Sequence, residues 1–224
     1  MRLTNIARLA AILLLGVLPQ RATAQFTTYT DLASFLAATT GAGTDTFDDL
    51  SLIDVTTSPM VRAAGSFGYT ATVNTTDFFG AGAPADRWLS TNTATDIVTF
   101  SGFGSGVRGV GGLFFGSDAG GSFRPGAIII LTAFTMSGSS SRTVMDATLA
   151  SFIGFVAESD IMSFTVEAVQ PFDGSLIWPA VNDFVLAGAP GANVVPEPAT
   201  WTLTSLGFGL LVIVVTGRNR SRTA

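Results

Sequence analysis

The stretch SFTVEAV, residues 163–169, alternates polar and apolar side chains along its length. Successive side chains of a β-strand point to opposite faces, so this period of two predicts a strand with one buried and one exposed face. The run AIIIL, residues 127–131, is apolar throughout, which is typical of a strand buried on both faces. Both patterns favour a β-sheet protein.

Further segments share these features, because they are short, rich in Phe and β-branched residues, and separated by Gly, Ser, Asn and Pro. The predicted strands are 45–50, 68–73, 96–100, 110–115, 127–134, 151–157, 162–169 and 182–186. One short helix precedes them, with Thr30 as its predicted N-cap, Asp31 in its first turn and Gly41 beyond its end. This pattern predicts a mostly β fold, an antiparallel two-sheet sandwich of jelly-roll type with one N-terminal helix.

The composition excludes several kinds of chemistry. The chain has no Cys, His or Lys. It therefore has no disulfide, no Ser-His-Asp or Cys-His triad, and no Lys nucleophile. The segment 25–195 keeps five of the 11 basic residues and 15 of the 16 acidic ones, a formal charge of −10. Nucleic-acid binding depends on cationic side chains that neutralise phosphates, so we do not expect it here.

The N-terminus has the three parts of a secretory signal peptide. Basic residues precede an apolar stretch at 9–18, and Ala22-Thr23-Ala24 supplies the small residues that signal peptidase requires. We expect cleavage before Gln25. The apolar stretch is too short to span a bilayer, which takes about 20 residues.

The C-terminus carries a second apolar segment, residues 201–216, which contains no charged residue. At 1.5 Å per residue it spans a bilayer only marginally. Arg218, Arg220 and Arg222 follow it, and this asymmetry places the tail on the cytoplasmic side and the acidic body outside. The sequence thus predicts a weak C-terminal membrane anchor.

The tripeptide Pro196-Glu197-Pro198 lies just before this segment. Together with the apolar segment, the terminal arginines and the leader, it resembles the PEP-CTERM sorting signal, which is also labelled an ice-binding protein C-terminal domain. The resemblance covers about the last 30 residues and implies an exosortase as processing partner besides signal peptidase. The expected organisation is a signal peptide at 1–24, a sandwich domain at 25–187, a linker at 188–195 and the sorting signal at 196–224.

The body is similar, more loosely, to the β-sandwich domains that precede such tails, through the helix with Phe35 and the segments 46–50 and 181–185. Those domains resemble carbohydrate-binding jelly rolls. The resemblance implies a non-enzymatic protein of the cell surface or biofilm matrix that contacts exopolysaccharide. A purely structural or adhesive surface protein without a sugar site is the alternative.

Three sets of residues are candidates for a site. Asp48, Asp49 and Asp183 would form a structural Ca²⁺ site if the first and last strands lie side by side, since Ca²⁺ takes oxygen ligands. Turn formation and edge-strand charge explain the same residues. Trp88 and Trp178 have polar neighbours and would stack on sugar rings if exposed, whereas core packing is the alternative.

The third set would make the protein a glycoside hydrolase. Glu158 and Glu167 are the only Glu residues of the body, and Asp160 lies near them in the sequence. Glycoside hydrolysis requires two carboxyl groups facing each other across a cleft at about 5–9.5 Å. Charged residues on a solvent-exposed face explain this set equally well, so we expect no enzyme activity.

Overall fold

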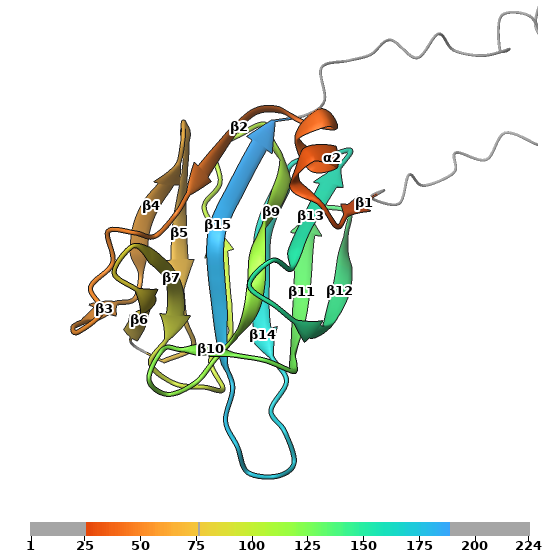
Figure 1. The fold of residues 1–224 in the computed structure, drawn as a ribbon. Coiled ribbons are helices and arrows are strands. Elements are labelled where there is room, and N and C mark those ends of the chain that lie inside the picture. Colours follow the sequence, from red (N-terminus) through yellow and green to blue (C-terminus); the bar gives the residue numbers. More distant parts are fainter. Residues whose placement is uncertain (1–25, 76, 189–224) are drawn as a thin grey trace, which may run out of the picture. The chain divides into compact units, whose positions relative to one another are not determined.

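The computed structural model describes residues 26–75 and 77–188. Two antiparallel sheets make up this part, which confirms the predicted β-sandwich (Figure 1). The predicted signal peptide with Ala22, Ala24 and Gln25, and the sorting tail with its apolar segment, lie outside the described residues.

One sheet has nine strands and the other has six, and every described pairing is antiparallel. The nine-stranded sheet has the order β1 (Phe26–Tyr29), β13 (Phe152–Ala157), β9 (Val107–Ser117), β15 (Trp178–Gly188), β7 (Asp86–Thr91), β6 (Asp77–Ala83) and β3 (Val55–Thr57), with β2 (Thr40–Asp45) on β15 and β10 (Phe123–Arg124) on β9. The six-stranded sheet has the order β12 (Gly138–Ala147), β11 (Ala127–Thr135), β14 (Ile161–Ala168), β8 (Val98–Ser101), β5 (Phe67–Thr72) and β4 (Met60–Ala64).

The main core lies between the two sheets and consists largely of Phe side chains. Phe100 of β8 stacks on Phe184 of β15 with 4.1 Å between ring centroids. Phe164 of β14 lies at 6.2 Å from Phe184, and Tyr69 of β5 packs on Phe184 at 5.2 Å. Aromatic pairs in such tilted or offset arrangements stabilise a core beyond the area that they bury.

The outer face of the six-stranded sheet is polar, as the alternation in 163–169 predicts. Thr165 of β14 lies opposite Thr132 of β11 on one side and Thr99 of β8 on the other. Ser141 and Thr72 extend this row to β12 and β5. A row of hydroxyl side chains therefore crosses five neighbouring strands on the outside of the sandwich.

The run at 127–131 lies in the same sheet, and the prediction that it is buried on both faces is wrong. Its burial alternates, because Ile128 and Ile130 point to the polar outer face and are only half-buried. The strands that are buried on both faces belong to the nine-stranded sheet, where all six residues of β13 are buried. There the helix α2 (Leu32–Ala37) covers the outer face (Figure 1).

Glycine makes this close cover possible. Phe35 of α2 is fully buried and packs edge-on against Phe152 of β13. A Cβ atom on Gly154 would lie 2.4 Å from the Phe35 ring, so no larger residue fits there without a shift. The covered face carries a second apolar cluster besides the main core; its buried members are Phe35, Phe152, Val156, Val185 and Ala187.

Two local predictions in the N-terminal part are also wrong. The N-cap of α2 is Asp31 and not Thr30, because the Asp31 carboxylate accepts a hydrogen bond of 2.8 Å from the Ser34 N–H. The strand expected at 45–50 is a turn, since β2 ends at Asp45. The Asp45 carboxylate accepts from the Phe47 N–H at 3.1 Å and so holds Phe47 at a φ of 62°.

The closing strand β15 changes its neighbour halfway along. It pairs with β7 at Val181 and with β2 from Phe184 onward. Between these points, β15 has one residue more than β9 opposite it, which is a β-bulge at 182–185. Asp183 lies in the bulge with a φ of 47°, a left-handed conformation that Asp tolerates better than most residues.

Candidate functional site

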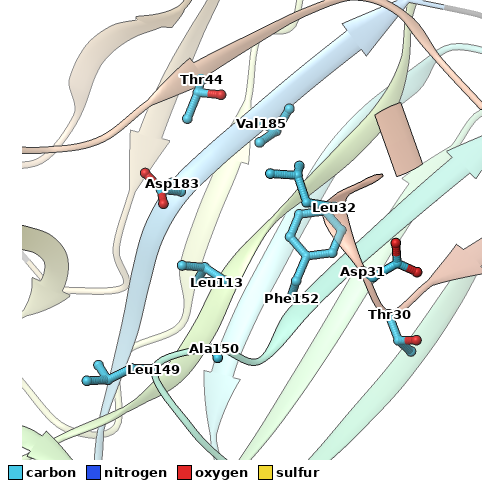
Figure 2. Close-up of a pocket in the computed structure, with 10 residues that line it drawn as sticks. All are labelled: Thr30, Asp31, Leu32, Thr44, Leu113, Leu149, Ala150, Phe152, Asp183 and Val185. Carbon is cyan, nitrogen blue, oxygen red and sulfur yellow. The ribbon is translucent and has the colours of Figure 1, made fainter. Parts of the chain in front are cut away.

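A groove of about 600 Å³ opens on the outer face of the nine-stranded sheet, beside α2 (Figure 2). Its apolar part includes Val185 and Phe152 of the second apolar cluster, together with Leu113 of β9. The residues that line it are Thr30, Asp31, Leu32, Thr44, Leu113, Leu149, Ala150, Phe152, Asp183 and Val185.

The bulge in β15 turns Asp183 toward this groove (Figure 2). Its N–H donates to the side-chain oxygen of Asn182 at 2.8 Å, and the Asn182 amide donates to Asp86 at 2.9 Å. Partial burial, and then the negative charges of Asp86 and Asp48, raise the pKa of Asp183. The groove thus ends at a carboxylate in a negative environment.

The predicted Ca²⁺ ligands are only partly brought together. β2 does pair with β15, and Asp48 lies close enough to repel Asp183. The Asp48 carboxylate accepts the Arg87 N–H at 3.0 Å, and this hydrogen bond lowers its pKa. Asp49 instead forms an ion pair with Arg62 at 2.6 Å. Among the described residues, no group of three or more acidic, His or Cys side chains is arranged to hold a metal ion.

Arg62 is the centre of a polar network, running from the buried Asp45 to the exposed Asp49, that the sequence did not reveal. Its guanidinium donates two hydrogen bonds of 2.7 Å to Asp45 and two more to Asp49. The Tyr69 hydroxyl also donates to Asp45, at 2.7 Å. Burial, the Asp45 charge and this hydrogen bond raise the pKa of Tyr69. Because all the partners are satisfied, the network fixes β2 against β4 and β5 and has a structural role.

Trp88 does not present a ring face to solvent. It is only 6 % exposed and packs edge-on against Phe115, with centroids 5.1 Å apart. β7 is an internal strand between β6 and β15, and Trp88 points into the core from it. The prediction of a sugar-stacking Trp88 is therefore wrong, and its core alternative is correct.

Trp178 lies at the start of β15 and is half-buried. It lines a second hollow of about 230 Å³ together with the half-buried Phe79 of β6. Asn92 and Asp118 line the same hollow, and the Asp118 carboxylate is held by the N–H groups of the following turn, at 2.9 Å. Asn92, which neighbours Trp88 in sequence, is thus placed beside Trp178. Aromatic faces next to amide and carboxylate groups suit a sugar ring.

The three carboxylates considered for hydrolysis are not gathered in either hollow. Asp160 pairs with Arg108 at 3.2 Å, and a hydrogen bond from the Gly106 N–H lowers its pKa. Glu167 lies opposite Ile130 on the exposed outer face of the six-stranded sheet, and Glu158 is exposed. Each of them is explained as a surface charge.

Comparisons with protein-family models, with curated proteins and with solved structures give no match for this chain. In the described ranges, no helix is long and apolar enough to cross a membrane.

Proposed function

We propose that the protein is exported, sorted by its PEP-CTERM-like tail, and acts outside the cell as a non-enzymatic sandwich domain that contacts exopolysaccharide. The leader, the Pro196-Glu197-Pro198 motif and the terminal arginines support the route. The pairing of the closing strand β15 with β2 supports a jelly-roll arrangement of the sandwich.

The observation that carries the sugar contact is the hollow at Trp178. Two half-buried aromatic rings, Trp178 and Phe79, border it, and Asn92 and Asp118 supply an amide and a carboxylate. Sugars bind proteins by stacking the apolar face of the ring on an aromatic side chain while polar groups bond their hydroxyls. The hollow combines both kinds of group in one place.

Retention of the full chain on immobilised host exopolysaccharide tests this proposal. We expect Trp178→Ala to weaken retention about tenfold, because the loss of an aromatic stacking contact costs roughly 0.5–1.5 kcal/mol beyond its buried area. Trp88→Phe is the control, since Trp88 lies in the core and its replacement leaves the surface unchanged. Equal retention of wild type and Trp178→Ala, with both folded, would instead favour a structural or adhesive protein without a sugar site.

Mass spectrometry of the protein recovered from the cell surface tests the sorting route. We expect a chain that begins at Gln25 and ends near Pro196–Pro198. A surface protein that still carries Arg218, Arg220 and Arg222 would contradict processing by an exosortase.

A further inference from the structure

The groove beside α2 is separate from the Trp178 hollow, since the two share no lining residue. Its volume of about 600 Å³ lies within the range of small-molecule sites, roughly 300–1,000 Å³. The groove is therefore large enough to hold a small ligand.

The lining of the groove restricts the chemistry of that ligand. Six of the ten lining residues are apolar, two are Thr and two are Asp, and none is basic. An apolar body is therefore favoured over a sugar, whose many hydroxyls would find few partners. Anionic ligands such as fatty acids are disfavoured, because Asp31 and Asp183 would repel them.

The two carboxylates lie at different ends of the groove. Figure 2 shows Asp183 on one side and Asp31 on the other, with the side chains of Phe152 and Leu32 between them. Asp31 is ionised at neutral pH, because the hydrogen bond from the Ser34 N–H lowers its pKa. The apolar middle with a negative charge at each end is complementary to a methylene chain with a positive charge at each end.

The surroundings of Asp183 strengthen this complementarity. Its carboxylate experiences the negative charges of Asp86 and Asp48, and it forms no ion pair in the described structure. A cation bound there would offset the repulsion among the three carboxylates. The bulge holds Asp183 in a left-handed conformation at the groove, and bulges commonly aim a side chain at a site.

We propose that this groove binds an aliphatic diamine in its doubly protonated form. One ammonium group pairs with Asp183 and the other with Asp31, while the methylene chain lies over Phe152 and Leu113. The ligand class is that of short linear polyamines, recognised by charge at both ends and by apolar contact between them.

Isothermal titration of the full chain at about 0.15 M salt tests the proposal, since this salt screens diffuse attraction to the acidic body. The probes are 1,4-diaminobutane, 1,5-diaminopentane and 1,8-diaminooctane, with 1-aminopentane and 1,5-pentanediol as controls. We expect saturable binding of one diamine per chain, binding of the monoamine that is weaker by about tenfold, and no binding of the diol.

Variants locate the site. Asp183→Asn should weaken binding of the best diamine at least about tenfold, and Asp31→Asn should also weaken it while the helix keeps an N-cap. Glu167→Gln removes the same charge from the opposite sheet and should leave binding unchanged. Trp178→Ala should leave it unchanged too, which separates this site from the sugar contact.

Two results would overturn the proposal. One is the absence of saturable binding for all three diamines. The other is an equal loss of binding in Asp183→Asn and Glu167→Gln, which would show that diamines act only as diffuse counterions of the acidic body.

Discussion

The two sheets of the sandwich bury one face in the shared core, and they differ in what happens on the other. The outer face of the six-stranded sheet carries the row of hydroxyl side chains around Thr165 and is open to water. The outer face of the nine-stranded sheet is covered by α2, and the groove lies at the margin of that cover. The six-stranded sheet therefore has a solvent-exposed polar outer face, whereas the nine-stranded sheet carries a second apolar layer on its outer face.

The two outer faces also differ in their glycine residues. β9 and β13 contain glycines whose missing Cβ atoms leave space for the Phe35 ring, above all Gly154 and Gly109. Strands of the six-stranded sheet place Thr and Ser at many of the outward positions instead. Double burial of a strand here combines an apolar run, as in β13, with small residues that let a second layer approach.

The largest expected effect comes from removing the ring that fills this space. Phe35→Ala should lower the free energy of unfolding by about 3–5 kcal/mol, because it leaves a cavity between α2 and the nine-stranded sheet. Leu36→Ala, on the exposed side of the same helix, should cost far less. Urea unfolding of both variants measures the difference, and equal losses would mean that α2 does not seal the sheet.

Gly154→Ala tests the same contact, between β13 and the Phe35 ring, by a change in the strand. The added methyl group meets the Phe35 ring, so we expect a loss of about 1–3 kcal/mol. Gly68→Ala is the matched control on the six-stranded sheet, because no atom lies within 4 Å of its added Cβ. In the double variant Gly154→Ala/Phe35→Leu, part of the loss should be recovered. If the losses in free energy of unfolding of the two single variants simply added, the proposed steric contact between residue 154 and the Phe35 ring would be contradicted.

Introducing a Thr hydroxyl on the outer face of each sheet compares the covered face with the solvent-exposed one. Val156→Thr on β13 should cost about 1 kcal/mol, because the residue is buried and the hydroxyl loses contact with water. Ile130→Thr on β11 extends an existing polar surface and should cost less than about 0.5 kcal/mol. Thermal unfolding of the two variants decides the point, and a reversed order would contradict it.

The smallest expected effect is that of Asp183→Asn at the groove, which should stabilise the protein where the other substitutions destabilise it. The pKa of Asp183 is raised in the folded protein, so the folded state binds this proton more tightly than the unfolded state. The ionised carboxylate, facing Asp86 and Asp48, therefore destabilises the fold at neutral pH. Asp183→Asn should raise the melting temperature slightly at pH 7, since Asn also tolerates the left-handed conformation.

This gain should shrink as the pH falls through the folded pKa and disappear below the ordinary Asp pKa of about 3.9, where both states are protonated. Melting curves from pH 7 to pH 3 follow it. A variant that is less stable than wild type at pH 7 would show that Asp183 has a structural role.

The sequence predicted the strands whose alternation is visible, because one face meets water and the other meets the core; 163–169 is the plainest case. It missed β12, whose run of Ser and Thr shows no apolar period, and it missed β6, which contains two glycines, and β7. In these strands, pairing with neighbours outweighs a weak local preference.

The candidate sites were predicted less well, because they depend on neighbours in space. Asp48 does approach Asp183, but through the turn after β2, which pairs with β15, while the first strand β1 pairs with β13. The partner of Asp49 could not be predicted. The groove draws on segments far apart in the sequence, so no local motif indicates it. Asp31 was visible only as a residue of the first helical turn.

The position of β15 also affects the order of events when the protein is made. This strand is the last in the described chain, yet it lies inside the nine-stranded sheet and joins β9, β2 and β7. That sheet cannot close until Trp178–Gly188 has left the ribosome, so a nascent chain lacking it holds unpaired strand edges. Until then β9, β2 and β7 lack their shared partner, and the nine-stranded sheet remains in separate parts.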